Sequence, residues 1–228
     1  MSIKMKKYIV TFLLLALPLA AISSDWKYEL SDALSKSENA TGITEYKVNM
    51  EVIDYYISRI AEHAKEYPPR FRSQEEFNDV AEKLEKLIGV LSIIGENQKQ
   101  NAEFLLRSAF AQSMAHNINM RGAADKAKDD FDKLLKLEPD NIKGNYLDGM
   151  FLSGTQKYHF ESIPYLEKAF TLGETDAQYT LGLLYYQQGD KGKGLRYLQE
   201  YAKNNPDQER VKKVISAIES GKLQFKHD

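Results

Sequence analysis

The chain of 228 residues contains no cysteine. This absence excludes disulfide bonds, thiolate metal sites, a cysteine nucleophile and a lipid-modified N-terminal cysteine. Histidine is scarce, and its four residues lie far apart: His63, His116, His159 and His227. Their spacing matches no metal-binding pair, so we predict no metal site and no cofactor. The chain also lacks a Gly-x-Ser-x-Gly elbow, a phosphate-binding glycine-rich loop and a calcium-loop pattern, which predicts a protein that is not an enzyme.

Proline and glycine are also few, with 6 and 13 residues, and they stand mostly between periodic segments, where they separate helices. With 43% apolar and 28% charged residues, the chain has enough apolar surface for one helical domain with a buried core. Basic residues are more frequent in residues 191–228, but they alternate with acids and have no interleaved aromatic platform. Nucleic acid is therefore not an expected partner.

Only one long apolar run occurs, from Tyr8 to Ile22, and three lysines precede it: Lys4, Lys6 and Lys7. The small residues of Ala21-Ile22-Ser23 are suited to cleavage before Ser24, so residues 1–23 are predicted to be a secretory signal peptide. The run contains Pro18 and is shorter than the ~20 residues of a spanning helix. An uncleaved membrane anchor is the alternative. With a lysine-rich start and no cysteine, we expect a periplasmic or secreted protein of a bacterial cell envelope.

Residues 24–72 are predicted to form an N-terminal helical segment. A short helix is expected from Trp26 to about Ser37, followed by a polar, flexible stretch to Gly42 and a second helix over residues 44–67. The second helix has a continuous apolar face, formed by Ile53, Tyr56, Ile57, Ile60 and Ala64. Pro68 and Pro69 are expected to end it.

From residue 73 onward, helices follow one another closely. Ser73 and Glu76 form a capping-box pattern, and an apolar stripe runs from there to Leu91, with Gly95 closing the helix. Another helix is expected over residues 98–116. Because only a few polar residues join the two helices, we expect them to lie antiparallel.

The most specific pattern is a 34-residue unit that begins at Thr175. Its positions 7, 8, 11, 20, 24, 27 and 32 are Leu181, Gly182, Tyr185, Gly194, Leu198, Tyr201 and Pro206. The preceding residues show the end of a similar unit, with Ala127, Phe131, Leu134 and Pro139 at positions 20, 24, 27 and 32. These spacings resemble the tetratricopeptide repeat, a helix-turn-helix unit that stacks on its neighbours because one unit cannot bury its apolar face alone.

A further unit covers residues 142–174, with Leu147 matched to Leu181. Leu147 and Leu166 are 19 residues apart and Leu181 and Leu198 are 17 apart, so the loop between the two helices is expected to be two residues longer. This loop and the Tyr165–Gly173 stretch also resemble the Sel-like variant of the same repeat. Both families imply one architecture.

The resemblance implies an all-α fold in which antiparallel helix-turn-helix repeats stack as a right-handed α-solenoid. We expect the repeats in residues 73–207, and a capping helix and tail in residues 208–228, where Gly221 is a stop signal. Positions 5, 9, 12 and 13 of such a unit face its concave groove. The implied partner-binding residues are Tyr179, Leu183, Tyr186 and Gln187, with Asn145 and Gly149 one repeat earlier. The alternative for the tyrosines is packing against the neighbouring repeat.

Two features depart from the repeat pattern. Gln178 stands at position 4, where a bulky aromatic residue is usual, and Gly194 replaces the common alanine. Gly194 and Gly192 should each cost about 1 kcal/mol relative to alanine, so their helix is expected to start late or to pack closely. The Lys-x-x-x-Asn clamp of some relatives is not supported, because Leu147 follows Lys143 at that spacing.

Together these patterns predict an exported, non-enzymatic helical repeat protein that acts as a protein–protein interaction scaffold in the cell envelope. Its partner is expected to be a protein or peptide, held through apolar and aromatic contacts. The membrane is expected to be involved only through the signal segment if it stays uncleaved. The alternative function is a carrier of a small apolar ligand or lipid, held between the N-terminal helices and the repeats.

Overall fold

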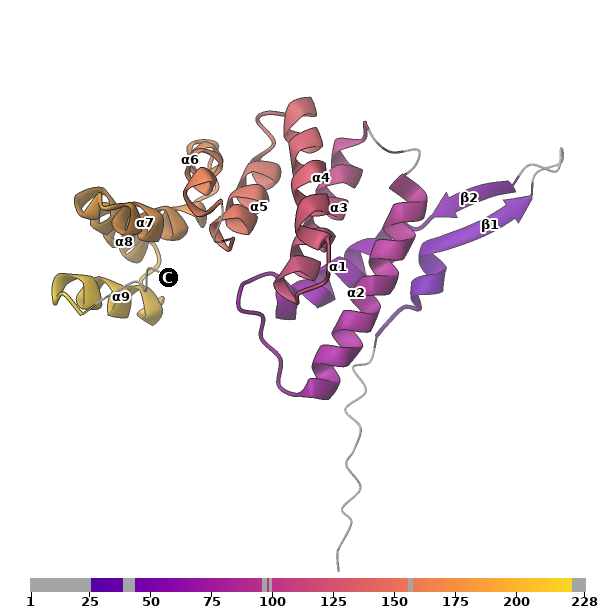
Figure 1. Cartoon of the computed structure of the whole chain (residues 1–228), viewed down its shortest axis with the longest axis horizontal. Helices are drawn as coiled ribbons and strands as arrows, with labels where there is room; N and C mark the ends of the chain where they lie inside the picture. The colour runs from indigo at the N-terminus through magenta and orange to yellow at the C-terminus, as the bar shows by residue number, and fades with distance from the viewer. Residues whose placement is uncertain (1–25, 39–43, 96–97, 99, 156–157, 223–228) are drawn as a thin grey trace, which may run out of the picture.

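The computed structural model describes residues 26–38, 44–95, 98, 100–155 and 158–222. Within these residues the architecture is a row of helices extending from an N-terminal hairpin at one end to a terminal helix at the other (Figure 1). The all-α repeat fold is therefore confirmed. The predicted signal peptide, residues 1–23, lies outside the described residues. No helix of the described part of the chain is long and apolar enough to span a bilayer.

The N-terminal segment differs from its prediction, because a β-hairpin replaces the expected first helix. A short 3₁₀ turn, η1 (Leu30–Ala33), leads into strands β1 (Leu34–Glu38) and β2 (Thr44–Val48), which pair antiparallel with Leu34 opposite Val48. The prediction of a helix from 26 to 37, and of a second one starting at 44, was wrong here. The β2 segment begins with threonine and ends with valine, both of which favour strands, and strand pairing outweighed the weak helical pattern.

The next two helices follow the predicted periodicity. Helix α1 (Met50–Ala64) buries all five residues of its predicted apolar face. Helix α2 (Gln74–Gly95) starts and ends as expected: the Ser73 hydroxyl oxygen accepts a hydrogen bond from the Glu76 backbone N–H at 3.1 Å. Glu76 itself turns to Arg72, accepting from its backbone N–H and its guanidinium. One half of the predicted capping box is therefore formed.

Three helix pairs follow. They are α3 (Ala102–Asn117) with α4 (Ala123–Leu137), α5 (Ile142–Ser153) with α6 (Ile163–Thr171), and α7 (Ala177–Gln188) with α8 (Lys191–Asn204). A 3₁₀ turn, η2 (His159–Ser162), precedes α6. Helix α2 contacts both α1 and α3 and contributes its apolar stripe to the N-terminal cluster.

Among the residues that the structure describes, the core is divided along the row of helices into three apolar clusters. The first lies under α1, α2 and one face of α3, the second between α3, α4 and α5, and the third between α6 and α7. Their largest fully buried side chains include Tyr56, Phe131 and Leu181. Each cluster joins neighbouring elements only, as expected for a repeat protein whose units contact their neighbours.

Glycines set the close crossing of the last pair. A Cβ atom at Gly194 would stand 2.6 Å from the Gly182 carbonyl oxygen, and one at Gly182 would stand 2.7 Å from Leu198 Cγ. Helix α8 begins at Lys191, ahead of both of its glycines. Of the two outcomes expected for Gly194, close packing is therefore the one observed.

The last helix, α9 (Glu209–Glu219), covers the end of the row next to α8 (Figure 1). Val211 and Ile218 are buried, whereas Val214 and Ile215 are half-buried. Gly221 follows with φ +67°, the left-handed conformation that glycine adopts readily after a helix. Helix α9 thus lies within residues 208–228, where a capping helix is predicted.

Candidate partner-binding groove

The first helices of the three pairs line one groove with a cavity of about 570 Å³. Helix α3 contributes Phe110 and Ser113, α5 contributes Tyr146 and Met150, and α7 contributes Tyr179 and Leu183. Tyr201 of α8 and the start of α9 close one end, whereas the α1–α2 loop, residues 65–67, forms the other rim. We call this surface the concave groove. Its walls come from first helices, as the repeat pattern implies.

Two of the predicted residues, Tyr179 and Leu183, lie in the concave groove. The Tyr179 ring packs against that of Tyr201, with 5.7 Å between the centroids, and the Arg210 guanidinium lies 5.9 Å from the Tyr179 ring centroid. The ring is half-buried, so it also faces solvent. It thus packs against its own neighbours and still offers a face to a partner.

The predicted Asn145 and Gly149 are buried and cannot contact a partner. Asn145 is 4% exposed, and its amide donates hydrogen bonds to the carbonyl oxygens of Pro139 and Asn141, both at 2.9 Å. Gly149 stands at a helix crossing, where an added Cβ would lie 2.6 Å from Leu166 Cγ. For these two residues the groove prediction was wrong.

The error is one of register. Gly149 meets Leu166 as Gly182 meets Leu198, so the two glycines are equivalent, and they are 33 residues apart rather than 34. Counting back 34 residues from Tyr179 and Leu183 therefore gave Asn145 and Gly149, each one position before the true equivalent. Tyr146 and Met150 are the groove residues of this repeat. Counting forward from residue 142, the start of the unit after Pro139, gives this register from the sequence.

The same equivalence corrects the α5–α6 loop. Gly149 to Leu166 spans 17 residues and Gly182 to Leu198 spans 16, so the spacing between the crossing residues is one residue longer rather than two. The loop itself is longer by more than that, because α5 ends at Ser153 and α6 begins at Ile163, whereas only Gly189 and Asp190 separate α7 from α8. The equivalence of Gly149 and Gly182 also matches Leu181 with Asp148, not with Leu147.

Tyr186 and Gln187 lie outside the concave groove. Gln187 Oε1 is 2.7 Å from His159 Nε2, so its side chain joins the end of α7 to η2. Tyr186 faces α8: its Cβ lies close to Gly194, and the Lys191 ammonium is 5.7 Å from its ring centroid. Position 12 and position 13 of this unit therefore take part in packing within the repeats.

The groove floor is aromatic and mostly uncharged. Burial, assisted by the carboxylates of Asp176 and Glu174, raises the pKa of Tyr146 to about 12, so its phenol stays protonated and available as a donor. The Thr180 hydroxyl donates to Met150 Sδ at 3.4 Å, which fixes the thioether in the wall. Charges stand at the rim, on Lys65, Glu66, Asp176 and Arg210.

Comparison with known proteins agrees with this geometry. The family model of the tetratricopeptide repeat matches residues 176–207, the unit that contains α7 and α8. The chain is a tetratricopeptide-like helical repeat protein.

Two solved structures share this tetratricopeptide-like fold. One is described as "MamA RS-1 ArsTM double mutant", at 22% identity and a TM-score of 0.54, covering 64% of this chain and 83% of that one. The other is a crystal structure of MamA, at 19% identity and a TM-score of 0.54, covering 67% and 86%. At these identities the likeness concerns the fold alone. None of the curated proteins matches the chain.

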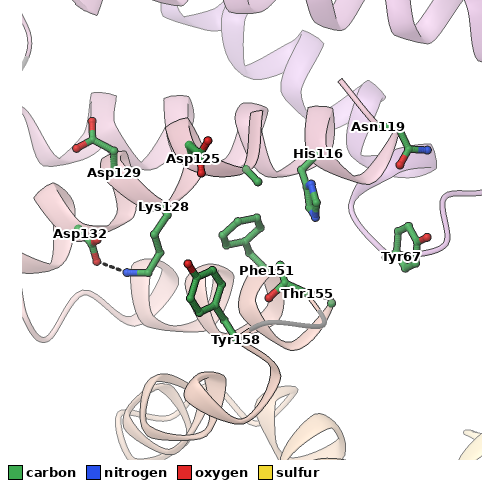
Figure 2. Close-up of a pocket in the computed structure, with 12 residues that line it drawn as sticks. Tyr67, His116, Asn119, Asp125, Lys128, Asp129, Asp132, Phe151, Thr155 and Tyr158 are labelled. Atoms are coloured by element: carbon green, nitrogen blue, oxygen red, sulfur yellow. Dashed lines mark hydrogen bonds and ion pairs between the residues drawn. The ribbon is translucent and has the colours of Figure 1, made fainter. Parts of the chain in front are cut away.

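A second cavity of the tetratricopeptide-like stack, of about 610 Å³, lies between α3, α4 and the end of α5 (Figure 2). Three aspartates from α4 line it, Asp125, Asp129 and Asp132, beside Lys128 and the rings of Phe151 and Tyr158. Lys128 forms an ion pair with Asp132. The sequence analysis did not find this cavity, because its walls come from three helices.

Histidines and acidic residues are spread over the described part of this tetratricopeptide-like protein. No group of three or more His, Asp or Glu residues there is arranged to hold a metal ion. His63 stacks on Phe71, and His116 packs edge-on against Phe151.

Proposed function

We propose that this protein is an exported, non-enzymatic scaffold that holds an extended segment of a partner protein in the concave groove. The observation that carries the proposal is the groove itself, where side chains from α3, α5, α7 and α9 surround one cavity of about 570 Å³. Tetratricopeptide-like repeats mediate protein–protein interactions through such surfaces. A protein partner is therefore the occupant that best suits the fold.

The chemistry of the groove favours a partner segment with aromatic or aliphatic side chains. Tyr146 and Tyr179 offer large apolar faces together with hydroxyl groups, and their two side-chain torsions lose little entropy on binding. Met150 and Leu183 add apolar walls that can adapt to several side chains. Charges of both signs at the rim suit a polypeptide better than a lipid tail.

Location in the cell envelope is a proposal supported by the sequence of residues 1–23. N-terminal sequencing of the protein purified from a periplasmic extract should give a chain that starts at Ser24. A chain that keeps residues 1–23 and sediments with membranes would instead support the uncleaved anchor.

The groove is tested by affinity capture from an envelope extract, with one groove variant and one matched control. The double substitution Tyr179→Ala with Leu183→Ala should reduce partner binding tenfold or more, because central groove residues each contribute more than about 1 kcal/mol. Tyr186→Ala removes an equally large ring from the same helix but outside the groove, so it should leave binding within about twofold of the unaltered protein.

Equal losses in the two variants, with both still folded by circular dichroism, would move the binding site away from the concave groove. The alternative function is tested on the same purified protein. Mass spectrometry that finds a stoichiometric lipid, displaced by Leu183→Ala, would favour a carrier of a small apolar ligand over a scaffold.

A further inference from the structure

Asp148 is a buried acid in the middle of the helix stack. Its residue is 0% exposed, and among the described residues neither carboxylate oxygen has a hydrogen-bond partner. The next repeat carries Leu181 at the equivalent position, just before the crossing glycine, and Leu181 is also 0% exposed. An ionisable group thus occupies a place that an apolar side chain fills one repeat later.

The charged groups near Asp148 come from α4. Lys128 favours the ionised carboxylate and Asp132 disfavours it, and these two residues also form an ion pair with each other. The Lys128 ammonium lies 5.9 Å from the ring centroid of Tyr165 on α6, whose phenol is also affected by the Asp148 charge. Lys128 is therefore shared among several groups: its ion pair is with Asp132 (Figure 2), and neither Asp148 oxygen has a hydrogen-bond partner among the described residues.

The charged groups of the other elements packed against α5 are engaged elsewhere. On α6, Lys168 forms an ion pair with Asp140, and Glu167 accepts hydrogen bonds from the Tyr185 hydroxyl and the Lys193 ammonium. His159 of η2 points to the Ser153 carbonyl oxygen and to Gln187. His116 of α3 packs against Phe151, and α7 has no charged residue in its sequence. Because burial disfavours the anion, the pKa of Asp148 is raised to about 7, with Lys128 lowering it and Asp132 raising it by smaller amounts.

We propose that Asp148 makes the contact between α4 and α5 a pH-dependent joint, closed while the carboxyl group is neutral and loosened when it ionises. A neutral carboxyl group is tolerated among apolar neighbours far better than an anion without hydrogen bonds. On ionisation the anion recovers solvation if α5 moves away from α4 or if water enters between them. The joint links the first helix pair to the second.

This joint lies next to the concave groove. Phe110 and Ser113 line the groove from the first pair, and Tyr146 and Met150 line it from the second. Loosening the joint changes the distance between these two walls. That consequence for binding rests on the proposed function, whereas the joint itself is independent of any partner.

The sign of the pH dependence follows from proton binding. In the unfolded chain Asp148 has an ordinary pKa near 4, and in the folded chain it holds its proton to about pH 7. The folded state therefore binds more protons between these values, so stability falls as pH rises through this window and levels off above it.

The test is urea unfolding of the purified protein from pH 5 to pH 8.5. For the unaltered chain the midpoint should fall by about 1 M between pH 5 and pH 8 and then level off. Asp148→Asn keeps the size of the side chain without its charge, and Asp148→Leu introduces the residue that the next repeat carries at this position. Both substitutions should remove most of the fall of the midpoint with pH. Asp125→Asn, an exposed acid on α4, is the matched control and should retain it.

Backbone hydrogen exchange locates the effect without any partner. Corrected for intrinsic rates, protection in α4 and α5 should drop at least fivefold between pH 6 and pH 8, with α7 and α8 changing much less. Asp148→Leu should abolish that local drop. A midpoint of the unaltered chain that does not change with pH, or an equal fall in Asp148→Leu, overturns the joint. Loss of partner binding with the joint intact would count against the proposed function only.

Discussion

Helix α8 contains two glycines that should respond in opposite ways to substitution by alanine. Nothing lies within 4 Å of a Cβ added at Gly192. At Gly194 the same atom would lie 2.6 Å from the Gly182 carbonyl oxygen and 2.6 Å from the Tyr186 backbone nitrogen. Both close contacts at Gly194 are to backbone atoms of α7, so no side-chain rotation can relieve them.

The magnitudes follow from this difference. Gly192→Ala should stabilise the protein by at most about 1 kcal/mol, because alanine has the higher helix propensity. Gly194→Ala gains the same propensity, but it must force α7 and α8 apart by most of an ångström, and overpacking costs about 1–3 kcal/mol. Because backbone must move, we expect a net loss of about 1–2 kcal/mol.

Urea unfolding followed by circular dichroism measures the pair. With a slope of about 2 kcal/mol per molar urea for a chain of this size, the two midpoints should differ by about 1 M, with Gly192→Ala the higher. The slopes should be equal, because neither change alters the surface exposed on unfolding. If Gly194→Ala proved as stable as Gly192→Ala, the close crossing of α7 and α8 described above would be refuted.

Two other substitutions separate structural from binding roles. Asn145→Ala should lower the free energy of unfolding by about 1–2 kcal/mol, because two carbonyl groups of the α4–α5 turn, those of Pro139 and Asn141, lose their hydrogen-bond donor. The amount of partner captured per folded molecule should not change. A selective loss of capture would show that Asn145 does contact the partner in the groove. Burial alone would raise the pKa of Glu167, but hydrogen bonds from the Tyr185 hydroxyl and the Lys193 ammonium outweigh burial and lower the pKa. The ionised carboxylate therefore stabilises the fold above its ordinary pKa, and this stabilisation is lost as pH falls through the lowered pKa. Because Lys193 and Glu167 are partly exposed, Glu167→Gln should cost at most about 1 kcal/mol at pH 7, and that cost should shrink as pH falls through the lowered pKa of Glu167. Thermal unfolding measures the cost, and a cost that stays the same on acidification would contradict the assignment.

Periodicity predicted the helices well wherever the apolar stripe was long. The five-residue face of α1 is buried as expected, and Gly95 and Gly221 mark helix ends in the structure as they did in the sequence. These features depend on local spacing and on backbone freedom, which a single sequence contains.

Features that depend on pairing between distant residues were harder to predict. The strand ending at Val48 is stabilised by its partner strand, and nothing in its own five residues requires that partner. The register of α5 depends on a loop and a turn whose lengths both depart from the 34-residue pattern, so Asn145 was placed in the groove and Tyr146 was missed. Asp148 was missed for the same reason, because the sequence analysis matched Leu147, and not Asp148, with the buried Leu181 of the next repeat.

The anchoring of Trp26 bears on how the folded body would sit beside a bilayer. Its indole Nε1–H donates to Asp79 Oδ2 at 3.0 Å, and its ring stacks on Tyr56 with 4.8 Å between centroids. In a chain that kept its leader, only Ser23, Ser24 and Asp25 would separate Trp26 from the end of the apolar run at Ile22. Three residues reach about 10 Å at full extension. A chain that kept its leader would therefore hold α1 and α2 almost against the lipid headgroups, with no tether long enough to let the groove turn freely toward a distant partner.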